Sequence, residues 1–168
     1  NDMLNRPAAS LADIAYTSHI GRDHFQHRVA IVATDKAQLA AKLQQAAETI
    51  DTVGVVYGTA KGTAVSTAFL FTGQGAQYEG MGKTLYETDP AFRSDMDRCD
   101  SLLKTEINVS LLDILWGEKA ELINDTQYTQ PAIFCLEYCV AQLWQRWGVK
   151  PAAFVGHSVG EYAAAVLA

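Results

Sequence analysis

The chain has 168 residues and a net charge of -6 at pH 7; 49% of its residues are hydrophobic and 19% are charged. This composition is typical of a globular protein with a buried core and excludes a disordered chain. The negative charge argues against nucleic acid as the main partner, because phosphate binding needs a basic face.

No stretch of the sequence is typical of a targeting signal or a membrane anchor. The N-terminal residues lack the basic-then-apolar pattern of a signal peptide. The longest apolar run, around residues 131–144, is interrupted by Glu137 and Gln142 and is too short to span a bilayer. We therefore expect a cytoplasmic protein with no membrane partner.

The three cysteines are expected to be reduced and buried. Their number is odd and none of them forms a C-x-x-C pair, so a disulfide framework or a metal site is disfavoured. Cys135 and Cys139 lie one helical turn apart in an apolar stretch, and Cys99 lies in an earlier segment. Such thiols behave as small hydrophobic side chains, so the sequence predicts no bound metal.

The first part of the chain alternates helical and strand patterns. The predicted elements are a helix between Ser10 and Gly21, a strand at 28–34, a helix at 36–50 and a strand at 54–58. Ser10 and Asp13 have the spacing of a capping box, and Asp35 is placed to cap the second helix. The nearly continuous apolar run at 28–34 is typical of a strand that is covered on both faces.

A small, glycine-containing stretch, 58–66, predicts a boundary between a first domain (1–64) and a second domain (65–168). The elements predicted after it are a buried strand at 67–72, a helix from Asp89-Pro90, a short helix at 110–117, a long helix at 129–148 and a buried strand at 152–157. The long helix carries an apolar stripe wide enough to be mostly buried. Strands separated by helices indicate an α/β protein with a mostly parallel sheet.

A serine between two glycines follows the last predicted strand. The segment "GHSVG", 156–160, fits the nucleophile elbow, in which a strand turns sharply into a helix and the serine takes a strained backbone conformation. Gly156 and Gly160 would leave room for neighbouring chain. The Ser158 hydroxyl would project at the tip of the strand, and N–H groups such as that of Val159 would point toward a reacting carbonyl. We interpret Ser158 as a nucleophile rather than as part of a plain tight turn.

A second glycine-rich turn, "GQGAQ" at 73–77, follows the earlier strand, from which a second oxyanion N–H would have to come. Glycines at Gly73 and Gly75 let backbone amides face a ligand without side chains in the way. Taken alone, this stretch is also compatible with a plain turn or an anion-binding loop.

Three motifs together resemble one family. The segments "FLFTGQGAQYEGMG", "TQPAIFCLEYCVAQLW" and "GHSVGEYAAA" occur in the order and at the spacing found at the start of an acyltransferase domain. The family comprises malonyl-CoA:acyl carrier protein transacylases and the acyltransferase domains of type I polyketide synthases and fatty acid synthases. The likeness covers about residues 66–168, and the part before it resembles the linker between ketosynthase and acyltransferase. The implied fold is a small α/β linker domain followed by the incomplete α/β-hydrolase-like core of an acyltransferase.

The resemblance also implies roles for single residues. Ser158 would take the acyl group from a coenzyme A thioester as an ester, and the backbone N–H groups of Gln74 and Val159 would form the oxyanion hole. His157 belongs to the motif, but its ring is expected to point away from the serine hydroxyl, so it is not the expected base. The residues expected to line the substrate pocket are Gln130, His157, Gly73 and Gly75.

A serine hydroxyl needs an adjacent base, and no histidine of this sequence suits that role. In the resembled family the base is a histidine far downstream, and an arginine between the two pairs with the malonyl carboxylate. His19, His24 and His27 lie in the linker-like part and are interpreted as surface or strand-end residues. We therefore expect a fragment, truncated after the elbow, that lacks the catalytic histidine and shows no measurable turnover by itself.

The implied function is to load an extender acyl group from coenzyme A onto the phosphopantetheine arm of an acyl carrier protein. Val159 favours malonyl, because methylmalonyl-selecting domains often carry glutamine there. The fragment itself would bind no cofactor; acyl-CoA, a carrier protein and an adjacent ketosynthase would be its partners. Two alternatives stay open. One is a non-catalytic linker or scaffold module, as expected for residues 1–64, and the other is a serine carboxylester hydrolase, against which "GQGAQ" and "TQPA" argue.

Overall fold

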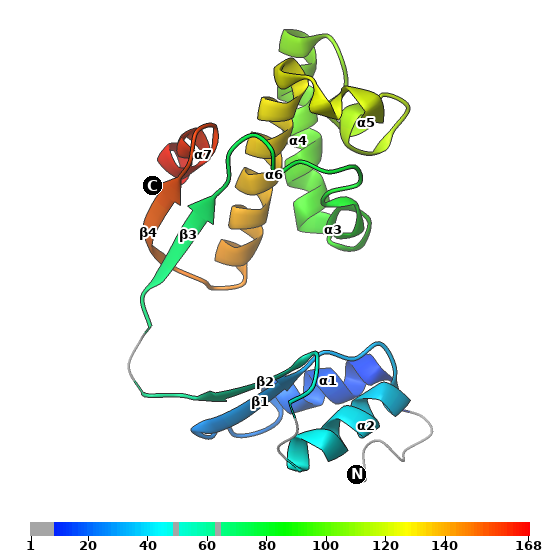
Figure 1. Cartoon of the computed structure of the whole chain (residues 1–168), viewed down its shortest axis with the longest axis vertical. Coiled ribbons are helices and arrows are strands. Elements are labelled where there is room, and N and C mark those ends of the chain that lie inside the picture. Colours follow the sequence, from blue (N-terminus) through cyan, green and yellow to red (C-terminus); the bar gives the residue numbers. More distant parts are fainter. Residues whose placement is uncertain (1–8, 49–50, 63–64) are drawn as a thin grey trace. The chain divides into compact units, whose positions relative to one another are not determined.

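The computed structural model describes residues 9–48, 51–62 and 65–168, and the chain divides into two compact units, 1–64 and 65–168 (Figure 1). Within the described residues, each unit combines helices with a two-stranded sheet. The fold class is therefore mixed α/β, as predicted.

Two helices and two strands make up the described part of the first unit. They are α1 (Leu11–Ile20), β1 (His27–Ile31), α2 (Lys36–Ala47) and β2 (Val55–Thr59). α1 begins at the predicted capping box: Ser10 Oγ accepts from Asp13 N–H at 3.1 Å, and the Asp13 carboxylate accepts from Ser10 N–H at 2.9 Å. The Asp35 carboxylate caps α2 by accepting from Gln38 N–H at 2.8 Å. Residues 49–50 of the helix predicted at 36–50 lie outside the described residues.

β1 and β2 form an antiparallel pair, in which Val29 lies opposite Tyr57. The expectation of mostly parallel strands is therefore wrong for this unit. β2 begins beside the end of β1, where Val32 N–H donates to Gly54 O at 2.8 Å, so the chain returns in the opposite direction. The expectation of a strand covered on both faces is also wrong, because Val29 is 46% exposed and Val32 is 73% exposed. The described helices of this unit are too few to cover both faces of the two-stranded sheet.

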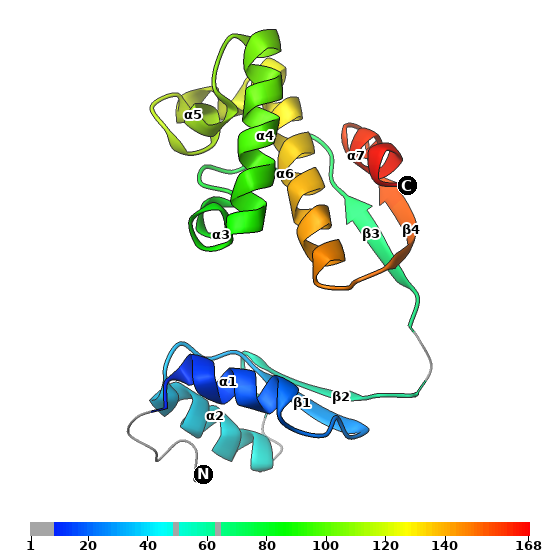
Figure 2. The ribbon, with the colours of Figure 1, turned by 180° about the vertical axis from the view of Figure 1, so that it is seen from behind.

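The second unit places a parallel pair of strands beside a group of helices (Figure 1). The strands are β3 (Thr67–Phe71) and β4 (Pro151–Gly156), and Phe71 lies opposite Gly156. The helices are α3 (Lys83–Thr88), α4 (Pro90–Ile107), α5 (Leu111–Trp116), the 3-10 helix η1 (Ala120–Asn124), α6 (Thr126–Arg146) and α7 (Gly160–Leu167). Figure 2, the view from behind, shows α6 between the strand pair and α4.

Local sequence explains where the long helices begin. Asp89 Oδ1 accepts from the N–H groups of Ala91 and Phe92, at 2.9 and 2.8 Å, so it caps α4 as predicted. Asp125 caps α6 by accepting from Gln127 N–H at 3.1 Å. α6 therefore starts at Thr126, three residues before the predicted start, because the carboxylate cap was not recognised in the sequence.

α6 lies at the centre of the core of the second unit. Seven of its residues are buried, and five of them belong to the main cluster, which packs them against α3, α4, α5 and η1. The fully buried partners outside α6 include Met81, Phe92, Met96, Leu111 and Ile114. The predicted apolar stripe is only partly buried, however, because Trp144 is 47% exposed and Trp147 is 59% exposed at the end of the helix.

The two strands of the second unit are buried on one face. Phe69, Phe71 and Phe154 pack with α6 and α7, whereas Leu70 is 77% exposed and Val155 is 53% exposed. Successive side chains of a strand point to opposite faces, and the helices cover only one of them. The prediction of fully buried strands is thus wrong for the second face.

Within the described part of the chain, no helix is both long and apolar enough to cross a bilayer.

Candidate active site

Ser158 lies at the sharp turn between β4 and α7. Its φ angle is 55°, and among the described residues Asn108 is the other non-glycine residue with a positive φ. Asn108 ends α4, a position where asparagine tolerates the left-handed conformation. A serine in this region is strained, and such strain persists only where the surrounding structure imposes it. The backbone of Ser158 therefore has the geometry that the elbow motif predicts.

Close packing explains the two glycines of the motif. A Cβ atom added to Gly160 would lie 2.7 Å from Phe71 O, and one added to Gly156 would lie 2.5 Å from the backbone of Gly160. Only glycine fits where backbone segments approach this closely. The two glycines thus bring the start of α7 against the end of β3, next to Ser158.

His157 joins the elbow to the glycine-rich turn. Its N–H donates to Phe71 O at 3.1 Å, and a Cβ atom added to Gly73 would lie 2.6 Å from His157 Nδ1. The imidazole ring therefore lies against Gly73. Among the described residues there is no hydrogen bond between the His157 ring and the Ser158 hydroxyl.

Side-chain hydrogen bonds fix the glycine-rich turn itself. Gln74 Nε2 donates to Thr126 Oγ1 at 2.8 Å, and Gln130 Nε2 donates to Gln74 Oε1 at 3.2 Å. Gly75 has a φ angle of 111°, in the region that favours glycine, and its N–H donates to Gln77 Oε1 at 2.8 Å. The start of α6 thus holds the turn through the side chain of Gln74 and leaves the backbone of that residue available.

Gln130 and Ser158 line one cavity of about 510 Å³. Its other lining residues are Val159, Glu161, Tyr162 and Ala165. Gln74 does not line this cavity but contacts Gln130 through a hydrogen bond. The structure therefore brings together Ser158, Val159 and Gln130 around one space, with Gln74 beside them, while Gly73 is covered by the His157 ring.

The two backbone N–H groups predicted to form the oxyanion hole have no partner among the described residues. Neither Gln74 N–H nor Val159 N–H donates a hydrogen bond to any residue that the structure describes, whereas Gly160 N–H donates to His157 O at 3.0 Å. A buried amide without a partner is costly, and this applies to Val159, which is 7% exposed, whereas Gln74 is an exposed residue. Such donors are suited to an oxygen atom of a ligand, and an oxyanion hole consists of donors of this kind.

The cysteines form a separate group in the core of the second unit. Cys99 Sγ lies 3.8 Å from Cys139 Sγ, and Cys99, Cys135 and Cys139 are free thiols. Hydrogen bonds from Cys135 and then Cys139 hold the pKa of the Cys99 thiol well below that of an ordinary thiol. The bonds to Cys99, followed by burial, raise the pKa of Cys135 and Cys139. Among the described residues, no group of three histidine, cysteine or acidic side chains is arranged to hold a metal ion.

Sequence reasoning missed two supports of this site. Thr126 holds the Gln74 side chain, and Glu137 accepts hydrogen bonds from Thr72 at 2.5 and 2.7 Å. The one available signal was Glu137 itself, a charged residue in an otherwise apolar stretch. Thr126 carried no signal, because a threonine near a helix start is most simply interpreted as part of the cap.

Comparison with protein families gives two matches that together span most of the chain. Residues 68–168 match the family described as the acyl transferase domain. Residues 2–43 match the family described as CurL-like, PKS C-terminal. The acyl transferase match lies in the second unit, and the CurL-like match lies in the first unit.

Individual relatives agree with the family match. The orsellinic acid synthase armB of Armillaria mellea is 44% identical over 174 residues, which cover 99% of this chain and 8% of the relative. The solved acyl transferase domain of ZmaA superposes with a TM-score of 0.88 at 38% identity, over 99% of this chain and 39% of that one. A solved "type II PKS acyl-carrier protein in complex with its malonyl-transacylase" matches with a TM-score of 0.54 at 30% identity, over 61% of this chain and 32% of that one.

Proposed function

Since this chain belongs to the acyl transferase domain family of polyketide synthases, we propose that its second unit transfers an acyl group from a coenzyme A thioester to the phosphopantetheine thiol of an acyl carrier protein. The observation that carries the proposal is the left-handed Ser158, which lines a cavity together with Val159, whose backbone N–H has no partner among the described residues. A nucleophile and an oxyanion hole are the two parts that acyl transfer requires.

In the first half-reaction, Ser158 Oγ loses its proton and forms a bond to the thioester carbonyl carbon. The oxygen of the tetrahedral intermediate then accepts hydrogen bonds from Gln74 N–H and Val159 N–H. The carbon–sulfur bond breaks, coenzyme A leaves as the thiol with the proton, and an acyl ester remains on Ser158. In the second half-reaction, the phosphopantetheine thiol attacks the ester, gives its proton back to Ser158 and leaves as the new thioester.

The base for these proton transfers is proposed by resemblance. His157 is the one histidine in the sequence of the second unit, and its ring lies against Gly73. The family pattern supplies a histidine further along the polypeptide, together with an arginine for the malonyl carboxylate. We therefore expect that the 168 residues alone do not transfer radiolabel from malonyl-CoA to a carrier protein at a measurable rate.

Malonyl is the proposed acyl group. Val159 lines the cavity beside Ser158, and its small, apolar side chain leaves no amide that could contact a branched extender. The related complex of an acyl-carrier protein with its malonyl-transacylase supports this choice of substrate and partner. Gln130 would line the site from the opposite helix and keep Gln74 in place.

The test is to label the full-length protein with radioactive malonyl-CoA. We expect stable label on the polypeptide, mapped by mass spectrometry to the peptide that contains Ser158, and its transfer to added carrier protein. Ser158→Ala should abolish the label, a loss of at least about 1,000-fold, since the nucleophile is removed. Ser101→Ala is the matched control, because this exposed serine of α4 donates only to Asp97 O at 2.9 Å. Label that survives Ser158→Ala would refute the proposal, and rapid release of free acid without transfer would favour a hydrolase.

For the first unit we propose a structural role, as a linker that packs against a neighbouring domain such as a ketosynthase. The exposed valines of its sheet, Val29 and Val56, and of the segment after β1, Val32, support this role. The match of residues 2–43 to a polyketide synthase family favours it as well. Limited proteolysis tests the unit's independence: we expect a stable fragment ending near residue 64. Continuous degradation through this region would contradict it.

A further inference from the structure

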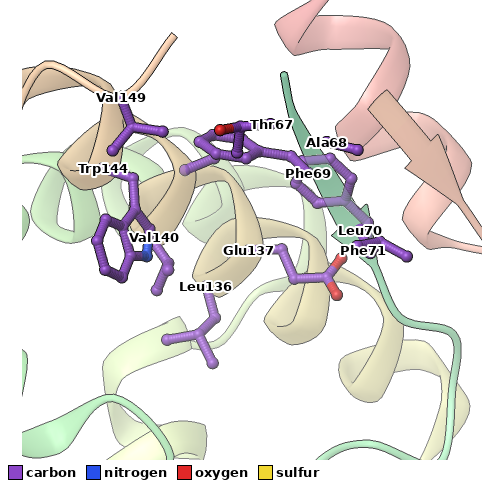
Figure 3. A pocket seen from close by; sticks show the side chains of 11 residues that line it. Thr67, Ala68, Phe69, Leu70, Phe71, Leu136, Glu137, Val140, Trp144 and Val149 are labelled. Carbon is purple, nitrogen blue, oxygen red and sulfur yellow. The ribbon is translucent and has the colours of Figure 1, made fainter. Parts of the chain in front are cut away.

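Glu137 bridges α6 and the end of β3. Its Oε1 atom accepts from Thr72 N–H at 2.5 Å and from Thr72 Oγ1 at 2.7 Å. Figure 3 shows Glu137 extending from α6 toward β3 at Leu70 and Phe71. Thr72 is the residue that joins β3 to the glycine-rich turn, and Gln74 follows it by two positions. The carboxylate therefore holds the point from which the turn begins.

Packing alone does not explain why position 137 carries a glutamate. It lines an apolar groove of about 550 Å³ together with Leu136, Val140 and Trp144. Its second oxygen, Oε2, is buried and has no hydrogen-bond partner among the described residues. Burying such an oxygen is costly, and an apolar side chain would fill this face of α6 better. The two bonds to Thr72 are the gain that offsets this cost.

Thr72 also contacts the elbow from its other side. A Cβ atom added to Gly160, at the start of α7, would collide with Thr72 O and would lie 2.7 Å from Phe71 O. Thr72 thus lies between Glu137 of α6 and the helix start that carries Val159 N–H. A shift of Thr72 would change the position of Gln74 N–H relative to Val159 N–H and Ser158.

We propose that Glu137 is a positioning residue for acyl transfer: through Thr72 it sets the distance between the two halves of the oxyanion hole. This inference rests on the proposed function of Ser158. Glu137 itself does not touch the cavity that Ser158 lines, so it acts through Thr72 and not on the substrate. Its loss should lower the rate of acylation rather than the affinity for acyl-CoA, because the hole binds the oxyanion more strongly than the ground-state carbonyl.

The experiment measures acyl-Ser158 formation in single turnovers of the full-length protein over a range of malonyl-CoA concentrations. We expect Glu137→Ala to reduce the maximal rate about 100-fold, as misplacement of a catalytic group by about 1 Å can do. The apparent Kd for malonyl-CoA should stay within about twofold of that of the unsubstituted protein. Thr72→Val, which removes only the hydroxyl bond, should reduce the rate about 10-fold. Thr72→Ser, which keeps the hydroxyl, should have the rate of the unsubstituted protein.

Matched controls separate positioning from general destabilisation. Glu106→Ala removes an exposed glutamate of α4, and Thr105→Val removes a threonine that donates only to Leu102 O at 3.2 Å. Melting temperatures are recorded for all variants, and rates are compared only where each is folded. If Glu137→Ala does not fold, the pair Thr72→Val and Thr72→Ser decides.

The outcomes distinguish the inference from the function it rests on. Equal acylation rates in the unsubstituted protein and in folded Glu137→Ala, or equal rates for Thr72→Val and Thr72→Ser, would overturn the positioning role and leave the proposed function intact. A weaker apparent Kd with an unchanged maximal rate would also overturn it. Absence of label from Ser158 in the unsubstituted protein would overturn both.

Discussion

The two units of the chain bury their side chains to very different extents. In the described part of the first unit, Ile14 and Val55 are the buried hydrophobic residues, and α2 buries none. The second unit has a core cluster of 13 buried residues around α6. Burial of apolar surface is the main favourable term in folding. The core of the second unit is therefore large enough to hold the site in place. The first unit depends more on local hydrogen bonds, and its exposed apolar surfaces remain available for packing against another domain.

Truncation of a buried residue should show this difference most strongly. Phe92→Ala in the second unit should cost about 3–5 kcal/mol, because Phe92 is fully buried and its removal leaves a cavity. Val55→Ala in the first unit should cost about 1–2 kcal/mol, since valine loses fewer buried atoms and Ile14 is the other buried hydrophobic residue described in that unit. Hydrogen exchange followed by mass spectrometry reports the opening free energy of each unit separately.

A control keeps this pair interpretable. Val56→Ala changes the residue beside Val55, but Val56 is 66% exposed, so the change should stay within about 0.5 kcal/mol. A cost for Val55→Ala as large as that for Phe92→Ala would break the comparison, because it would mean that the first unit is as tightly packed as the second. A large cost for Val56→Ala would show that another surface covers the sheet in solution.

The cysteines test whether the core of the second unit is closed. The pKa of Cys99 is lowered by the thiols of Cys135 and Cys139 that donate to it, so its alkylation rate should rise less between pH 6 and pH 8 than that of an ordinary thiol. An ordinary thiol would react about 100-fold faster at pH 8 than at pH 6, because its thiolate fraction rises with pH. Cys135 and Cys139, which are 3% and 0% exposed and have raised pKa values, should stay unmodified at both pH values.

Iodoacetamide labelling with peptide mass spectrometry measures all three rates at once. The control is the same chain in urea, where the three thiols should react at similar rates with the ordinary pH dependence. A rate for Cys99 that rises about tenfold per pH unit in the folded protein would contradict the lowered pKa. Early modification of Cys139 would show that α4 and α6 separate readily, and this would weaken the contrast between the units.

Local signals account for most of the site that sequence reasoning found. The elbow at Ser158 was predictable because Gly156 answers a steric requirement that is local in the chain: a Cβ atom there would collide with the backbone of Gly160 and Glu161. Gln74 and Gln130 were placed by resemblance, and the structure joins them by a hydrogen bond of 3.2 Å across 56 positions. The bond from Thr72 to Glu137 spans 65 positions and leaves no periodic pattern in the sequence, so it was not predictable.

Burial was harder to predict than the elements themselves. The apolar runs at 28–34 and 67–72 correctly indicated strands, but Val32 and Leu70 are exposed. Composition shows that a segment is apolar enough to be covered, and tertiary structure decides which neighbours do so. The direction of β2 was likewise not predictable, since the alternation of elements does not define where a strand returns.

Helix caps provide the smallest and most direct comparison of the units. Ser10→Ala and Asp89→Ala each remove a side-chain cap, and each should cost about 1 kcal/mol. The consequences should differ in extent. α1 buries only Ile14, so loss of its cap should raise hydrogen exchange about fivefold along the whole helix. α4 is held by Phe92 and Met96, both fully buried, so the increase there should be confined to the first turn. An increase that spreads along α4 but stays at the start of α1 would reverse the comparison, because it would mean that packing, not capping, holds the first unit together.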